Sequence, residues 1–184
     1  MVYLFLAEGF ETIEALTVVD MLRRAKIEIT TVSITDSLDV KSSQGVPVKA
    51  DEILSNVKDK EAECLVLPGG MPGTTNLRAN ATLMDMVLKQ NDAGKYVAAI
   101  CAAPAVIFCE LGITKGMNST CYPSYNDKLE EEGVNLIKLP AVVDGNVITG
   151  MGMGTAIEFS YEIIKELRDK ELADQILDSI CFYK

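Results

Sequence analysis

Histidine and tryptophan are both absent from the 184-residue chain. Without histidine, neither a Cys–His nor a Ser–His catalytic arrangement can form within one chain, and a zinc site is not expected. Cysteine is scarce, odd in number and never arranged as Cys-x-x-Cys; the five positions are Cys64, Cys101, Cys109, Cys121 and Cys181. Because no secretory signal is recognisable, we expect reduced thiols in a cytoplasmic protein. Any activation of a thiol then depends on carboxyls, backbone amides, a helix dipole or a partner.

The chain also has few positively charged residues and no long hydrophobic run. Lysine and arginine number 17 against 27 acidic residues, which gives a net charge of −10 and argues against nucleic acid as the main partner. No apolar run approaches the roughly 18 residues of a membrane span. The apolar run 2–7 is too short for the core of a signal peptide and indicates a first strand. The length and the 48% hydrophobic content favour one globular domain over residues 1–184.

Short apolar runs alternate with amphipathic stretches along most of the chain. Strands are predicted at 2–7, 27–34, 46–49, 64–67 and 97–100, with a hairpin over 141–149. Helices are predicted at 11–25, 81–90, 102–111, 125–132, 155–167 and 170–179. Pro47 suits 46–49 to a sheet edge, and Thr155 with Glu158 has the spacing of a capping box. This order predicts an α/β domain with a largely parallel sheet.

The run 97–106 carries the most specific local signal, because an apolar strand enters Cys101 and small residues lead out into a helical pattern. This is the layout of a nucleophile elbow, and Ala99 and Ala103 leave room for the chain to turn back. A helix N-terminus near the sulfur favours thiolate, so we expect the pKa of Cys101 to lie below its usual range. The alternative is a buried strand that ends in an ordinary core cysteine, as we expect for Cys64 and Cys109.

Three loops follow predicted strands, at 8–10, 68–70 and Cys101, and should therefore share one rim of the sheet. Gly69 and Gly70 belong to a glycine-rich loop over 68–73. We predict that the backbone N–H groups of Gly70 and Ala102 form an oxyanion hole near the thiol, with Gly69 in the same binding loop. Two alternatives are a plain turn and a phosphate cradle, although the loop lacks the spacing and lysine of a P-loop.

Glu14 and Tyr122 are the remaining candidates for chemistry. Glu14 lies beside apolar positions of the helix 11–25; a buried carboxyl there would stay protonated and donate a hydrogen bond to a thiolate. The alternative is an acid that only complements the helix dipole. Tyr122 could offer its hydroxyl to a substrate, or could simply be a half-buried aromatic residue.

Five segments together resemble the ThiJ/PfpI superfamily, most closely its parkinsonism-associated branch, often called DJ-one, and the bacterial YajL-like relatives. The segments are Ala-Glu-Gly-Phe-Glu-Thr-Ile-Glu (7–14), Asp-Met-Leu-Arg-Arg-Ala (20–25), Val-Leu-Pro-Gly-Gly (66–70), Ala-Ala-Ile-Cys-Ala-Ala-Pro (98–104) and Gly-Thr-Ala-Ile-Glu-Phe (154–159). Each segment alone is unspecific, but the combination in this order is highly specific and covers nearly the whole chain.

The resemblance implies a flavodoxin-like sandwich, related to class I glutamine amidotransferases, and a homodimer. It also implies a low-pKa cysteine at Cys101, a protonated acid at Glu14 and oxyanion-binding amides at Gly70 and Ala102. The implied function is a cysteine-dependent glyoxalase or deglycase that acts without cofactor or metal on methylglyoxal, a small 2-oxoaldehyde, or on glycated adducts. The alternative is a redox sensor or chaperone of the oxidative-stress response that uses the same cysteine.

Three positions depart from the family pattern. Tyr122 stands before a proline where the branch often has histidine, so proton transfer falls to Glu14, water or Tyr122. Ala103 stands where the elbow often has glycine. Ala102 stands where protease-like members have histidine, so we do not expect peptidase activity.

Overall fold

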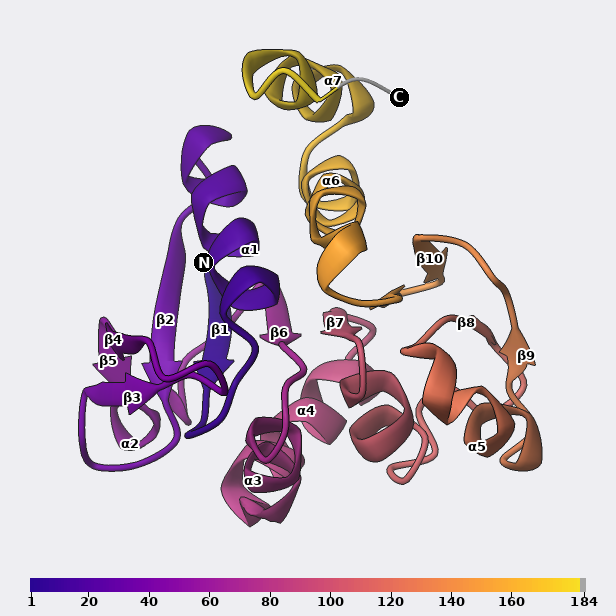
Figure 1. Ribbon diagram of the computed structural model, residues 1–184, viewed down its shortest axis with the longest axis horizontal. Coiled ribbons are helices and arrows are strands. Elements are labelled where there is room, and N and C mark those ends of the chain that lie inside the picture. Colours follow the sequence, from indigo (N-terminus) through magenta and orange to yellow (C-terminus); the bar gives the residue numbers. More distant parts are fainter. Residues whose placement is uncertain (183–184) are drawn as a thin grey trace.

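A seven-stranded sheet forms the centre of the computed structural model, which describes residues 1–182 (Figure 1). Its strands are β1 (Val2–Leu6), β2 (Ile29–Ser33), β5 (Glu52–Ile53), β6 (Cys64–Leu67), β7 (Tyr96–Ile100), β10 (Ala141–Asp144) and β11 (Val147–Gly150). The strand order is β10-β11-β7-β6-β1-β2-β5, and every neighbouring pair is parallel except β10 and β11. The predicted, largely parallel α/β sheet is therefore confirmed.

Helices and two small sheets complete the described chain. The α-helices are α1 (Thr12–Arg24), α2 (Leu54–Val57), α3 (Gly73–Ala79), α4 (Ala81–Asp92), α5 (Asn126–Glu131), α6 (Ala156–Leu167) and α7 (Lys170–Ser179). A π-helix (Pro104–Phe108) and two 3₁₀ turns (Pro123–Tyr125 and Met153–Thr155) lie between them. The small sheets pair β3 (Asp39–Lys41) with β4 (Pro47–Lys49) and β8 (Asn118–Ser119) with β9 (Asn135–Leu136).

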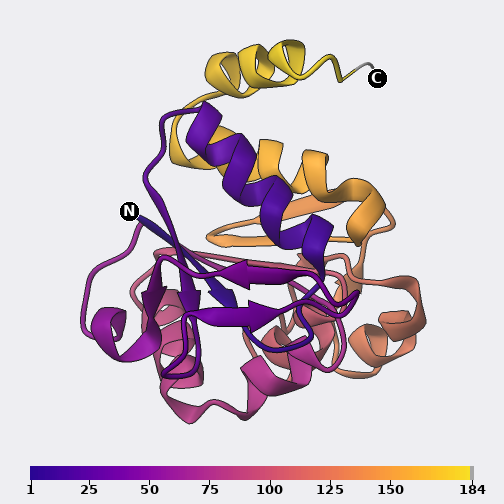
Figure 2. The same ribbon diagram turned by 60° about the vertical axis from the view of Figure 1, so that its left-hand side comes forward.

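Helices cover both faces of the central sheet. Figures 1 and 2 show α1, α6 and α7 on one side, and α3, α4 and the π-helix on the other. Successive strand residues point to opposite faces, so Leu4 joins the core under α1 and α6 while Phe5 joins the core under α4. Because both faces are covered, β1 is buried along its whole length, which explains its unbroken apolar sequence.

The predicted strand at 46–49 forms β4, which pairs with β3 in a two-stranded sheet and is therefore an edge strand, as Pro47 suggests. Two other local expectations, by contrast, prove wrong. The predicted α-helix over 102–111 is in fact a five-residue π-helix, in which the Cys109 N–H donates to the Pro104 carbonyl at 2.9 Å, five residues back. The short insertions that make a π-helix are frequent at functional sites, and this one directly follows the Cys101 turn.

The capping box at the start of α6 does not form. Thr155 ends a 3₁₀ turn, and its hydroxyl donates to the Gly152 carbonyl and accepts from the Gly152 N–H. The side chain of Thr155 therefore makes no capping hydrogen bond to α6. The preceding turn directs the hydroxyl backward, and the sequence spacing alone does not reveal that turn.

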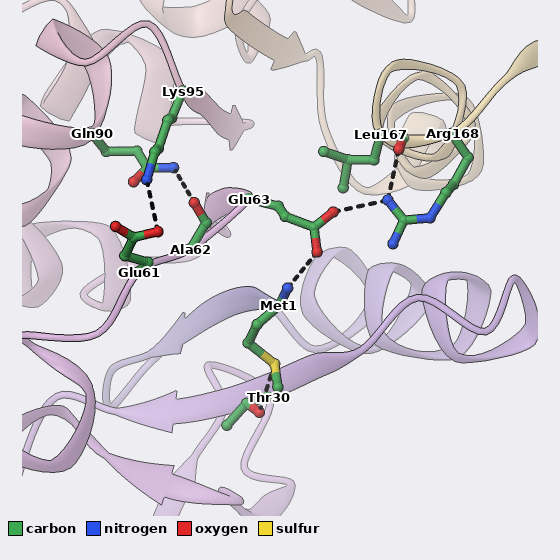
Figure 3. A network of polar contacts seen from close by, with 9 residues as sticks. All are labelled: Met1, Thr30, Glu61, Ala62, Glu63, Gln90, Lys95, Leu167 and Arg168. Carbon is green, nitrogen blue, oxygen red and sulfur yellow. Dashed lines mark hydrogen bonds and ion pairs between the residues drawn. The ribbon is translucent and has the colours of Figure 1, made fainter.

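Ion pairs tie the amino end of β1 to neighbouring elements (Figure 3). Glu63, just before β6, pairs with the Met1 ammonium and with Arg168 at 2.8 Å, at the end of α6. These contacts lie at the amino ends of β1 and β6, whereas the loops of the predicted site follow their carboxyl ends. No helix of the described chain, residues 1–182, is long and apolar enough to cross a membrane.

Candidate active site at the Cys101 turn

Cys101 occupies a strained turn directly after β7. Its φ of 66° lies in the left-handed region, which non-glycine residues seldom adopt and which clusters at functional sites. The Cys101 N–H donates to the Gly150 carbonyl at 2.9 Å, and its carbonyl accepts from the Tyr122 N–H at 2.8 Å. The predicted nucleophile elbow is therefore present, and two backbone hydrogen bonds hold it from either side.

The glycine-rich loop after β6 packs directly against this turn. A Cβ on Gly69 would lie 2.5 Å from the Cys101 Cβ and 2.6 Å from Glu14 Oε2, so only glycine fits. The Glu11 N–H donates to the Gly69 carbonyl at 2.9 Å, which fixes the loop against the start of α1. The three loops predicted to share one rim are thus in contact with one another.

Glu14 is a buried carboxyl, 1% exposed, on the first turn of α1. Its Oε2 accepts from the Gly69 N–H at 2.8 Å, while Oε1 is buried without a hydrogen bond of ordinary geometry to the described residues. Burial raises the pKa of Glu14 to about 7, and the charge of Glu11 adds to the increase. The Cys101 thiol and the N–H groups of Gly69 and Met153 act in the opposite direction. A carboxyl with this pKa can hold or release a proton near neutral pH.

The thiol of Cys101 responds to the same surroundings. Burial and the neighbouring Glu14 carboxylate raise the pKa of Cys101 to about 12, against the N–H groups of Ala102 and Gly70, which lower it. The expected low pKa is therefore not found beside an ionised Glu14. Protonating Glu14 removes the repulsion and supplies a donor for the sulfur, so the two groups titrate as a pair that shares a proton.

The N–H groups of Ala102 and Gly70 are the two predicted donors, and both act on the Cys101 sulfur. Gly69, predicted to bind alongside them, instead donates its N–H to Glu14 and so positions the carboxyl. Tyr122 also adjoins the elbow: its side chain is 48% exposed, and its ring covers Gly152, where a Cβ would lie 3.3 Å from Cδ2.

The loop after β11 also belongs to the site, and the sequence did not point to it. The Met153 N–H approaches the Glu14 carboxylate, and a Cβ on Gly152 would lie 4.0 Å from Glu14 Oε1. A usable signal was present, because glycine alternates with methionine over 150–154 directly after a predicted strand. Among residues 1–182, no group of three or more acidic residues and cysteines is arranged to hold a metal ion.

The structure combines a flavodoxin-like fold with a cysteine at a strand-to-helix elbow, and these two features define the class of protein. Residues 1–166 match the model of the DJ-1/PfpI family, and the chain belongs to that family. The resemblance drawn from sequence is therefore confirmed.

Individual relatives extend this result. The chain is 36% identical over 171 residues to protein DJ-1 homolog A of Arabidopsis thaliana, covering 93% of this chain but only 44% of that longer protein. It is 29% identical over 177 residues to glutathione-independent glyoxalase DJR-1.2 of Caenorhabditis elegans, covering 96% and 93% of the two chains. The structure of oxidised Toxoplasma gondii DJ-1 superposes with a TM-score of 0.95 at 34% identity, over 100% of this chain and 98% of that one.

Proposed function

We propose that this protein is a cysteine-dependent glyoxalase or deglycase that acts on methylglyoxal or its adducts without a cofactor. The observation that supports this most is the Glu14 carboxyl, whose pKa of about 7 suits proton transfer and which is buried against the Cys101 thiol. The N–H groups of Ala102 and Gly70 are available beside the same sulfur to stabilise a negative oxygen. A relative named as a glutathione-independent glyoxalase adds support.

The proposed reaction begins when Glu14 takes the thiol proton and the sulfur attacks the aldehyde carbon. A C–S bond forms, and the carbonyl electron pair moves to oxygen, which the N–H groups of Ala102 and Gly70 hold until Glu14 protonates it. As a carboxylate again, Glu14 removes the proton from this carbon and delivers it to the neighbouring carbonyl carbon, while the hydroxyl proton of the first carbon passes to the oxygen of the second. The first carbon becomes a thioester and the second an alcohol. Water then hydrolyses the thioester, releasing a 2-hydroxy acid and restoring Cys101.

Other parts of the proposal rest on less direct support. Tyr122 is proposed to assist proton transfer through its hydroxyl, because its N–H donates to the Cys101 carbonyl and its side chain is half exposed beside the elbow. The protein is proposed to be a single domain that works as a cytoplasmic homodimer, with α1 at the interface. Ile13 of α1 is a large apolar side chain that is 48% exposed, which suits such an interface.

The test measures lactate formed from methylglyoxal by metal-free protein. Cys101→Ser and Glu14→Gln should each lower kcat/KM by about 10²-fold or more, since general acid–base groups typically contribute about 10²–10⁴-fold. Cys181→Ser changes an exposed cysteine on the tail after α7 and serves as the matched control with unchanged activity. Tyr122→Phe tests whether the Tyr122 hydroxyl contributes to proton transfer. Lactate production by Cys101→Ser at the wild-type rate would overturn the proposal.

A redox sensor or chaperone is the second candidate function. Cys101 is partly exposed whereas Cys64, Cys109 and Cys121 are buried, so peroxide reaches Cys101 more readily than those three. A protonated Glu14 can donate a hydrogen bond to a cysteine sulfinate. Peroxide treatment followed by peptide mass spectrometry should then find two added oxygen atoms on Cys101. If the sulfinate forms while methylglyoxal is not converted, this candidate replaces the first.

A further inference from the structure

Large hydrophobic side chains gather at the edge of the Cys101 site. Six such side chains are exposed among residues 1–182: Ile13, Val46, Met71, Tyr122, Leu139 and Met153. Three of them, Met71, Tyr122 and Met153, are 51%, 48% and 54% exposed and belong to the loops that build the site. We call these three the apolar rim. Scattered exposed apolar residues need no explanation, but three around one cysteine indicate a binding surface.

The backbone places each rim residue next to the reacting groups. Met71 directly follows Gly70, whose N–H acts on the Cys101 sulfur. The Met153 N–H approaches the Glu14 carboxylate. The Tyr122 N–H donates to the Cys101 carbonyl at 2.8 Å. The three residues therefore come from separate loops, which follow β6, β8 and β11.

The inner wall of the site leaves no room for a large substituent. Gly69 approaches so closely that even one added carbon would lie 2.5 Å from the Cys101 Cβ and 2.6 Å from Glu14 Oε2. A group attached to an aldehyde carbon at the sulfur must therefore extend away from Gly69 and toward solvent, where the rim residues are exposed. Two carboxyls, Glu11 and Glu14, lie on the α1 side of the site and disfavour an anionic substituent.

We propose that the apolar rim makes this site selective for neutral 2-oxoaldehydes with a large apolar substituent over methylglyoxal. This inference rests on the proposed function and specifies its substrate class. Methionine suits the role because its flexible, polarisable side chain adapts to different shapes and packs well against aromatic rings. The Tyr122 ring can stack on an aryl group in an offset or edge-to-face arrangement.

The first test compares kcat/KM for phenylglyoxal and methylglyoxal in the wild type and in the double variant Met71→Ser/Met153→Ser. The phenylglyoxal-to-methylglyoxal ratio should fall about 3- to 10-fold, which corresponds to the loss of roughly 30–55 Å² of apolar contact. The value for methylglyoxal should fall less than the value for phenylglyoxal, because a methyl group offers less apolar area to the rim than a phenyl ring. Leu139→Ser, which removes a side chain 53% exposed outside the rim, is the matched control with an unchanged ratio.

A second measurement does not depend on turnover. Phenacyl bromide and iodoacetamide both alkylate thiols, and their rates at Cys101, each normalised to free cysteine, report binding in front of the sulfur. The wild type should favour phenacyl bromide, and the double variant should lose most of that preference. If neither oxoaldehyde is converted but this loss is seen, the proposed function fails and the selectivity of the rim stands. The rim inference is wrong if both oxoaldehydes are converted and the double variant changes neither the ratio of their kcat/KM values nor the ratio of the two alkylation rates.

Discussion

The backbone of Gly69 packs closely against both reacting side chains, Cys101 and Glu14. We expect Gly69→Ala to lower the free energy of unfolding by about 1–3 kcal/mol, because the added methyl must displace Cys101 or Glu14 in a well-packed site. It should also reduce turnover of methylglyoxal. Gly154→Ala is the control, since a Cβ there meets no atom within 4 Å. Denaturant unfolding of both variants checks this, and equal stability would contradict it.

Glu14 makes the stability of the protein depend on pH. Its pKa is about 7 in the folded chain against about 4.3 unfolded, so folding is most favourable below the unfolded value and loses stability as pH rises through 7. Glu14→Gln removes this loss. We expect the free energy of unfolding of the variant to exceed that of the wild type by roughly 2–4 kcal/mol at pH 8 and by much less at pH 5. Urea unfolding at the two pH values measures this difference. A pH-independent difference would contradict the assignment.

The sequence identified the side chains of the site better than its backbone groups. Cys101 and Glu14 could be found because a strand end and a helix face give each a recognisable position. The sequence shows the glycine-containing loops of Gly69 and Met153, but the interaction of each N–H with Glu14 depends on loops that meet only in the fold. The increase in the pKa of Cys101 caused by burial and by an ionised Glu14 could not be predicted from sequence, because it depends on those same contacts.

At the scale of single elements, α7 offers a clean test of capping. Asp169 precedes this helix, and its carboxylate accepts from the Leu172 N–H at 2.8 Å. Asp169→Ala should lower the free energy of unfolding by about 1 kcal/mol. Asp169→Asn retains a hydrogen-bond acceptor and should lower it by only a small fraction of that. Hydrogen exchange of the first α7 amides and thermal unfolding report the difference. Identical behaviour of the two variants would show that the cap contributes nothing.

Elements with a strong hydrophobic period were predicted well. β1, β6 and β7 read as unbroken apolar runs because helices cover both faces, and α1 and α6 show clear helical spacing. Prediction failed where tertiary contacts determine the secondary structure. The helix α3 begins in a glycine-rich loop without apolar periodicity, and the π-helix after Cys101 cannot be distinguished from an α-helix by pattern.

At the scale of the whole molecule, the proposed homodimer predicts a particle of twice the chain mass. Light scattering at micromolar concentration should give about twice the 20.0 kDa of one chain. Ile13→Lys should shift the particle toward the monomer, because it places a charge on an exposed apolar position of α1. Leu139→Lys, at a similarly exposed position away from α1, should leave the mass unchanged. A monomeric wild type would remove the dimer from the proposal.

The site draws its parts from positions between Glu11 and Met153, and the hydrogen bond from the Cys101 N–H ends on Gly150 of β11. No short stretch of the chain therefore holds the chemistry by itself. Under the proposed function, the number of thiols that react in the way expected of Cys101 measures the correctly assembled fraction of a preparation without the use of any substrate. A chain shortened before residue 150 would keep the cysteine and still fail that count.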